Sequence, residues 1–394
     1  MSSRQSLSSD VAIKKEFNLS TRVHPTATNL PAAKASPKDS PSAWAEISPA
    51  EGASFLRDFC ARVGTANADT APNEPQTLWC PDLVSTRDLG PAGVGTVLQL
   101  AAIMKARPAD FWRSLAGRQV VMFFEKPSLR TRLTFEAGVS GLGGHAMFVD
   151  QTHERLDARE SLSDVAHNLE RWVDLIVLRT YSQQTIAGMA QHASVPVINA
   201  LSDLEHPCQA LADYMTLTEH FGDLRHRCLA YVGDGNNVAH SLLLTGACLG
   251  SSIRIATPPG YEPNAQIVAD AFAIAEETGA SIKLLNDPHR AVAGADAVYT
   301  DAWTSMGQER QEQERARIFP PYQVNSDLMA EAAPHAVFMH CLPAHRGLEV
   351  TDEVMDSDRS LIFDQAENRL HAQKAILYLL LGGGDRRPAR SAHA

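Results

Sequence analysis

The sequence predicts an α/β fold with two doubly wound parallel-sheet domains joined by long helices, and a C-terminal helix that returns to the first domain. From about residue 76 onward, short apolar or β-branched runs alternate with amphipathic segments, which is typical of parallel sheets with helical crossovers. The chain has 394 residues, enough for two domains at roughly 150 residues each.

The expected strands are, in chain order, the runs at residues 119–124, 145–150, 174–179, 195–201, 228–233, 252–257, 281–286, 296–300, 336–341 and 361–365. Residues 160–173 are expected to form a helix, because Leu162, Val165, Leu169 and Trp172 recur at helical spacing. A long helix is expected after His206, and a last one over residues 366–381.

These elements divide the chain into five parts. We expect a disordered extension over residues 1–75, with one short helix near 54–62, because this stretch is rich in Ser, Ala, Pro and Thr. The other expected parts are a first domain over 76–211, a second domain over 212–366, a C-terminal helix over 367–382 and a disordered tail over 383–394.

Composition excludes several classes of protein. A net charge of -11 argues against a nucleic-acid binder that works through a general basic field. Six scattered cysteines favour a reducing compartment, and no apolar run is long enough to cross a membrane. We therefore expect a cytoplasmic protein. The extension is basic up to Lys38, which leaves an organelle transit peptide as the less favoured alternative to a solvated tail.

The segment FFEKPSLRTRLTFEAG predicts an anion site. It follows a strand, and Ser128 is a good N-cap for a helix whose first backbone N–H groups point outward. Arg130 and Arg132 would add planar donors suited to phosphate oxygens. The alternative is that these arginines pair with surface carboxylates such as Glu136, and this segment alone does not decide between the two.

Polar residues follow other expected strands. Arg179, His206 with Gln209, and His340 with Cys341 each lie close to a strand end. A single histidine or cysteine in such a place is usually a packing residue. Several such groups converge on one crevice if the sheets are parallel, because ligands bind at the carboxyl ends of the strands.

The segments SLRTR, HPCQ and HCLPA resemble, in this order, the signature segments of the aspartate and ornithine carbamoyltransferases. Between them, YVGDGNNVAHSLL and DAWTSMGQE resemble the ornithine branch of that family, and the resemblance runs from about Gln76 to Leu381. It implies that the first domain binds carbamoyl phosphate and the second L-ornithine. It implies direct attack of the δ-amine, through a tetrahedral intermediate, to give citrulline and phosphate.

The resemblance also implies site residues, no metal, no cofactor and a homotrimer. Those implied for carbamoyl phosphate are Ser128, Leu129, Arg130, Thr131, Arg179, His206, Gln209, Cys341, Leu342 and Arg369. Those implied for ornithine are Asn237, Asp301, Ser305 and Met306. Arg130, His206, Asp301 and Cys341 are implied to be catalytic.

Two segments depart from the family pattern. Leu129 replaces a threonine in the phosphate loop, so one hydroxyl is missing unless the position acts through its backbone N–H. The loop at residues 150–161, which in this family reaches a neighbouring subunit, has Asp157 at a usual glycine and Gln151 one place from the expected glutamine. We leave Gln151 out of the predicted site.

Three alternatives remain open from the sequence. The acceptor could be N-acetylornithine, N-succinylornithine, putrescine or aspartate, although Asp301 suits a free α-ammonium. A nicotinamide-dependent dehydrogenase is disfavoured, because Val238 stands where the third glycine of the dinucleotide motif belongs. A non-catalytic binding protein is disfavoured, because the charged pocket residues are intact. The sequence leaves the anabolic or catabolic direction open.

Overall fold

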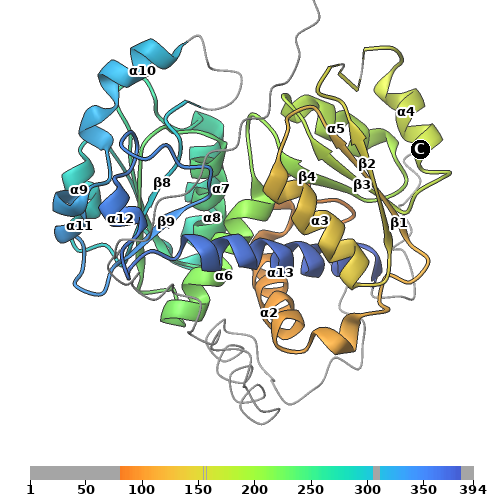
Figure 1. The fold of residues 1–394 in the computed structure, drawn as a ribbon, viewed down its shortest axis with the longest axis horizontal. Coiled ribbons are helices and arrows are strands. Elements are labelled where there is room, and N and C mark those ends of the chain that lie inside the picture. Colours follow the sequence, from red (N-terminus) through yellow and green to blue (C-terminus); the bar gives the residue numbers. More distant parts are fainter. Residues whose placement is uncertain (1–79, 154, 157, 305–310, 383–394) are drawn as a thin grey trace, which may run out of the picture. The chain divides into compact units, whose positions relative to one another are not determined.

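The computed structural model describes residues 80–153, 155, 156, 158–304 and 311–382. The predicted extension, its short helix near 54–62 and the predicted tail over 383–394 lie outside the described residues. In the described part, the strands form two fully parallel sheets with helical crossovers (Figure 1). The predicted fold class is therefore confirmed.

The first sheet has four strands in the order β2-β1-β3-β4. They are β1 (Gln119–Phe124), β2 (His145–Asp150), β3 (Leu175–Arg179) and β4 (Val197–Leu201). The residues of β3 and β4 are all buried, which explains their nearly continuous apolar sequence, since helices cover both faces of a parallel sheet.

The second sheet has five strands in the order β7-β6-β5-β8-β9. They are β5 (Cys228–Val232), β6 (Ser252–Ala256), β7 (Ile282–Leu285), β8 (Ala297–Thr300) and β9 (Val337–His340). The first nine expected strands are thus present, with ends that differ by no more than two residues from the expected ones.

Helices connect these strands. The first group is α2 (Gly90–Ala106), α3 (Leu129–Gly141), α4 (Leu162–Leu169), α5 (Gln183–His192), α6 (Pro207–Phe221), α7 (Asn237–Cys248) and α8 (Ala265–Thr278). The second group is α9 (Pro288–Val292), α10 (Glu312–Ile318), α11 (Ser326–Ala330), α12 (Asp352–Met355) and α13 (Ile362–Leu380). The described residues also form the short 3-10 helices η2 (Thr86–Asp88), η3 (Pro108–Phe111) and η5 (Pro320–Tyr322). Among the described residues, no helix is both long and apolar enough to cross a membrane.

Helix α13 returns to the first domain, as predicted. It packs against α2, α3 and α6 and also touches β9 of the second sheet (Figure 1). Residues such as Arg369, Ala372 and Ile376 are buried along it. This helix therefore carries side chains from the second domain to the carboxyl edge of the first sheet.

The expected strand at 361–365 is wrong, because α13 begins four residues earlier than predicted. Ser360 makes only an isolated bridge to Phe338 of β9, and the chain turns into the helix at Ile362. Phe363 is 75% exposed, whereas a residue of a covered strand would be buried. A short apolar run cannot distinguish a strand from the first turn of a buried helix.

The expected helix at 160–173 is shorter than predicted. Helix α4 ends at Leu169, and the chain turns through Glu170 and Arg171. Val165 and Leu169 are buried, but Trp172 is 67% exposed. Trp172 therefore does not share their buried face.

Each sheet has one point where the strand order reverses. In the first sheet this point lies between β1 and β3, and in the second between β5 and β8. The helices that follow the paired strands leave on opposite faces at such a point, so a crevice opens at their carboxyl ends. Arg130 and Arg179 lie at the first crevice, and Asn237 and Asp301 lie at the second.

Gly235 of the YVGDG segment allows another part of the backbone to pack closely against this turn. A Cβ on Gly235 would collide with the backbone of Tyr261, Glu262 and Pro263. Protein backbone thus occupies the place beside this turn where the dinucleotide motif would need to receive a pyrophosphate. This packing disfavours the dehydrogenase alternative further.

Gly246 in the middle of α7 gives a test of the packing between helix and sheet. Its added Cβ would overlap the Tyr214 hydroxyl and the Ile253 side chain, both fully buried. We expect Gly246→Ala to lower the free energy of unfolding by about 1–3 kcal/mol, the usual cost of overpacking, as measured by urea denaturation. The matched control is Gly141→Ala in α3, where the nearest neighbour, Lys374 Nζ, lies 3.8 Å from the added Cβ. Equal stability of the two variants would contradict this account.

Candidate active site

One cavity of about 550 Å³ lies at the carboxyl ends of both sheets. Every predicted site residue that the structure describes lines it: Ser128, Leu129, Arg130, Thr131, Arg179, His206, Gln209, Asn237, Asp301, Cys341, Leu342 and Arg369. Ser305 and Met306 lie outside the described residues. The structure thus brings together groups from seven separate segments of the chain.

The N-terminus of α3 forms one wall. Ser128 caps the helix as predicted, because its hydroxyl accepts a hydrogen bond from the backbone N–H of Thr131 at 3.3 Å. The side chain of Leu129 is 71% exposed, so this residue can serve an anion in the cavity only through its backbone. The unpaired N–H groups of this first turn and the positive end of the helix favour a bound anion.

Three arginines bring positive charge to this wall. Arg179 is buried and donates to the carbonyl oxygen of Lys126 at 3.2 Å. Arg369 is buried and donates to Thr131 Oγ1 at 2.6 Å and to Gln209 Oε1. Among the described residues, no carboxylate forms an ion pair with Arg130, Arg179 or Arg369. Burial lowers the pKa of Arg179 to about 9 and also lowers the pKa of Arg130 and Arg369.

Arg132 has a different place. Its Nε donates to Glu136 at 2.9 Å, its guanidinium lies 3.9 Å from the ring centroid of Phe148, and it does not line the cavity. Of the two possibilities that the sequence left open for this arginine, pairing with a surface carboxylate is therefore the one observed.

His206 and Gln209 form the floor beside Arg369. His206 precedes α6, and its backbone N–H donates to Ser241 Oγ at 2.8 Å. Its ring is buried, and Nδ1 has no hydrogen-bond partner in the described part of the chain. Burial and the nearby Arg369 and Arg179 hold the pKa of His206 well below its usual value. The imidazole is therefore neutral and offers one N–H donor.

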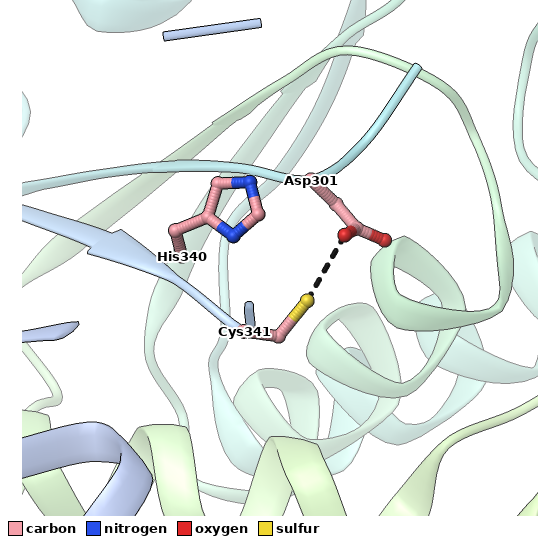
Figure 2. Close-up of side chains that lie close together, drawn as sticks. All are labelled: Asp301, His340 and Cys341. Carbon is pink, nitrogen blue, oxygen red and sulfur yellow. Dashed lines mark hydrogen bonds between the residues drawn. The ribbon is translucent and has the colours of Figure 1, made fainter. Parts of the chain in front are cut away.

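The second sheet supplies the opposite wall. Asn236 caps α7, and its Nδ2 donates to Asp301 Oδ2 at 2.8 Å. Asn237 donates to the carbonyl oxygen of Ser202 at 2.6 Å. Cys341 Sγ donates to Asp301 Oδ1 at 3.0 Å (Figure 2). Burial and the Asp301 carboxylate raise the pKa of Cys341 well above its usual value, so Cys341 is a protonated thiol.

Asp234, two residues before the Asn236 cap, has a different partner. It pairs with the buried Arg315 at 2.9 Å, and Arg315 also donates to the carbonyl oxygen of Trp303 at 2.6 Å. Arg315 therefore joins the turn after β5 to the turn after β8. Burial raises the pKa of Asp234 to about 6.

Asp301, His340 and Cys341 lie close enough that their ligand atoms could approach one ion, since these atoms lie within 4.8 Å of one another (Figure 2). However, His340 Nδ1 accepts the N–H of Leu342 at 2.9 Å, and Nε2 lies 3.3 Å from Glu349 Oε1. Both ring nitrogens of His340 thus have partners, and metal ligation would break one of these contacts. These contacts of His340 disfavour a metal site formed by the three residues. His340 has the packing role that is usual for a single histidine near a strand end.

Several cavity residues were not predicted. Those with polar side chains are Lys126, Thr304, Glu312 and His345. Thr304 and Glu312 flank the undescribed residues 305–310, and the loop after HCLPA brings His345 to the cavity. Arg346 in that loop pairs with Asp352 and Asp356, each at 2.7 Å, and so stabilises the loop. Gln151 lies in a separate pocket with Arg155 and Trp172.

Comparison with known proteins identifies both halves of the described structure. The carbamoyl-P binding domain of the aspartate/ornithine carbamoyltransferases matches residues 81–219. The Asp/Orn binding domain of the same family matches residues 225–380.

Two curated relatives are similar over most of their length. The chain is 50% identical over 304 residues to the ornithine carbamoyltransferase of Pyrococcus abyssi, covering 77% of this chain and 96% of the relative. It is 49% identical over 304 residues to the anabolic ornithine carbamoyltransferase of Pyrococcus furiosus, with the same coverage of 77% and 96%. A solved structure of ornithine carbamoyltransferase from Pyrococcus furiosus gives a TM-score of 0.74 at 49% identity, covering 77% of this chain and 97% of that one.

The neutral, buried state of His206 predicts a pH effect on stability. Its pKa is depressed in the folded state and near 6.5 in the unfolded state, so its contribution to stability is fully present above pH 6.5 and is lost as the pH falls below it. We expect the free energy of unfolding to fall between pH 7 and pH 5 by up to about 2 kcal/mol more in the unchanged chain than in His206→Asn. Urea denaturation at both pH values measures this difference. An identical pH dependence of the two proteins would show that His206 is not a buried neutral group.

Proposed function

Because the chain belongs to the aspartate/ornithine carbamoyltransferase family, we propose that the cavity described above is its active site. The chain transfers the carbamoyl group of carbamoyl phosphate to ornithine. One observation supports this assignment most strongly. Three arginines, which have no carboxylate partners in the described part, lie opposite a carboxylate and a thiol. The arginines suit an anionic donor, and the carboxylate suits a cationic acceptor.

The phosphate group of the donor binds at the N-terminus of α3. Arg130 and Arg179 supply charge-assisted donors, and the first backbone N–H groups of the helix supply neutral ones. Phosphate is the leaving group, and its negative charge grows as the bond to the carbamoyl carbon breaks. The same donors therefore bind the substrate and stabilise the transition state.

The carbamoyl oxygen faces His206 and Thr131. The hydroxyl oxygen of Thr131 accepts from Ser128 at 2.9 Å and from Arg369 at 2.6 Å, so its own hydrogen is available to a ligand. The neutral His206 offers one N–H. Attack on the carbamoyl carbon converts this oxygen to an oxyanion, and both donors stabilise that charge better in the tetrahedral intermediate than in the substrate.

Ornithine binds at the second wall. Asp301 receives the α-ammonium group, Asn237 contributes a polar contact, and the δ-amine points to the carbamoyl carbon beside Cys341 and the backbone of Leu342. The family resemblance adds Ser305 and Met306 for the α-carboxylate. The δ-amine must lose a proton from a pKa near ~10.4, as for lysine, before it attacks. The buried carboxylate of Asp301 orients the δ-amine for that step.

The reaction proceeds by direct attack on the donor. The raised pKa of Cys341 keeps it a protonated thiol, and thiols are nucleophilic only as thiolates. Cys341 therefore acts as a hydrogen-bond donor to Asp301 and forms no carbamoylated intermediate. Positioning and electrostatic stabilisation supply the catalysis.

The buried carboxylate of Asp301 also argues against acylated ornithines, because an uncharged amide would leave it without a cationic partner. A non-catalytic binding protein has no observation in its favour, since the described polar residues of the predicted site all line one cavity.

We further propose that the chain is a homotrimer that works in the cytoplasm in arginine biosynthesis. The printed name of the Pyrococcus furiosus relative, anabolic ornithine carbamoyltransferase, supports the direction. Exposed apolar side chains on the first domain, Leu129, Leu133 and Trp172, support assembly with other copies. Sedimentation equilibrium that gives the mass of one chain would contradict the trimer.

Citrulline formation tests the proposed function. We expect the purified protein to form citrulline from carbamoyl phosphate and L-ornithine, and to turn over N-acetylornithine, N-succinylornithine, putrescine and aspartate at least about 100-fold more slowly, because each leaves buried groups of the second wall unpaired. Colorimetric detection of the ureido product measures all five reactions. Comparable turnover of N-acetylornithine would contradict the role of Asp301, and no turnover with any acceptor would contradict catalysis.

A further inference from the structure

A second carboxylate, Asp213, lies behind the cavity and is not among its lining residues. It is fully buried on α6, one helical turn after Gln209. Its Oδ1 accepts from Gln209 Nε2 and from Gln365 Nε2, each at 2.7 Å, and its Oδ2 accepts from the Tyr299 hydroxyl at 3.1 Å. All three polar neighbours therefore donate to this one side chain.

The contacts of Gln209 leave only one orientation for its amide group. On one side lies the carboxylate of Asp213, which accepts hydrogen bonds, and on the other lies the guanidinium of Arg369, which can only donate. The NH2 group must therefore face Asp213 and the carbonyl oxygen must face Arg369. Gln209 lines the cavity, and its carbonyl oxygen, which accepts from Arg369, has a second lone pair that can accept from a ligand.

We propose that Asp213 is a positioning residue that makes the site selective for a carbamoyl group over other acyl groups. The proposal rests on the proposed function. The carbamoyl group of the donor ends in an NH2 group, and the fixed Gln209 oxygen accepts a hydrogen bond from it. An acetyl group has a methyl at the same place and cannot donate. Without Asp213, the NH2 group of Gln209 loses its acceptor and only Arg369 still holds the amide, so the oxygen is placed less firmly and this distinction weakens.

The ionisation state of Asp213 does not change this arrangement. Burial raises the pKa of Asp213 to about 7. A proton on Oδ2 can be donated to the Tyr299 oxygen, while Oδ1 continues to accept from Gln209. Asparagine has the same shape as the protonated acid and can keep its oxygen toward Gln209.

The same carboxylate also reaches the second domain. Gln365 Oε1 accepts the backbone N–H of His340 at 3.0 Å, and its NH2 group donates to Asp213 and to Tyr299. Asp213 thus links Gln209 to the end of β9, next to Cys341, through a chain of hydrogen bonds. This chain gives the Gln209 amide a rigid support.

Two stable phosphonates provide a direct test. Phosphonoacetamide carries the amide NH2 of the carbamoyl group, and 2-oxopropylphosphonate carries a methyl in its place. Their dissociation constants, measured by isothermal titration calorimetry with the full chain, give a selectivity ratio. We expect Asp213→Leu to bind phosphonoacetamide about tenfold or more weakly, because the NH2 group loses its acceptor, and to bind 2-oxopropylphosphonate within about twofold of the unchanged chain.

Two controls isolate the orientation of Gln209. Asp213→Asn should keep the selectivity ratio, because its oxygen still accepts from Gln209. Tyr299→Phe should also keep it, because this change leaves the Oδ1 atom of Asp213 and its contact with Gln209 in place. If circular dichroism shows that Asp213→Leu does not fold, Asp213→Ala makes the same deletion in a smaller volume.

Equal loss of affinity for both phosphonates in Asp213→Leu would overturn the proposal, because a general structural defect cannot distinguish NH2 from methyl. Unchanged affinity for both would overturn it as well. Failure of the unchanged chain to bind either phosphonate would instead overturn the proposed function on which the proposal rests. The two failures are therefore distinguishable.

Discussion

The structure depends on positive charge held in a buried place without a carboxylate beside it. In the described part, Arg179 is held by the carbonyl oxygen of Lys126, and Arg369 by the oxygens of Thr131 and Gln209. These acceptors are neutral, so they fix the guanidinium groups without cancelling their charge. Burial of such groups costs folding free energy, which the lowered pKa of Arg179, about 9, reflects. An anionic ligand that brings two or more negative oxygens recovers this cost, and the rest of the site is arranged around the place where that ligand binds.

The two parallel sheets make this arrangement possible. Each opens a crevice where its strand order reverses, between β1 and β3 in one sheet and between β5 and β8 in the other. The first crevice carries the arginines and the start of α3, and the second carries Asp301. Helix α13 then brings Arg369 from the second domain to the first crevice. In the proposed function, donor and acceptor therefore bind in one cavity, so the electrophilic carbon and the attacking amine can meet without a covalent carrier.

Much of this could be predicted from the sequence, and the exceptions have physical reasons. Buried strands such as β1 can be predicted because almost all of their residues are apolar, and the Ser128 cap can be predicted because capping depends on residues that are close in the chain. The strand predicted at 361–365 is wrong because a run of only five residues fits a strand and the start of a helix equally well. Arg132 could not be told from Arg130, since which arginine faces the cavity depends on the contact between Arg132 and Phe148. Asp213 had only one signal, its spacing of four residues from Gln209. Its partners Tyr299 and Gln365 are remote in the chain, so no local pattern could reveal the network.

The most direct test of the account is thermal unfolding in increasing inorganic phosphate, the product anion, at an ionic strength kept constant with chloride. Because an anion that binds only the folded state stabilises it by mass action, the account predicts that Tm rises with phosphate in the unchanged chain and in Arg132→Ala. In Arg130→Ala, which removes a cavity-facing guanidinium, the rise should be lost or strongly reduced. A Tm that does not respond to phosphate in the unchanged chain, or an equal rise in Arg130→Ala and Arg132→Ala, would contradict the claim that Arg130, with the buried Arg179 and Arg369, forms an anion site.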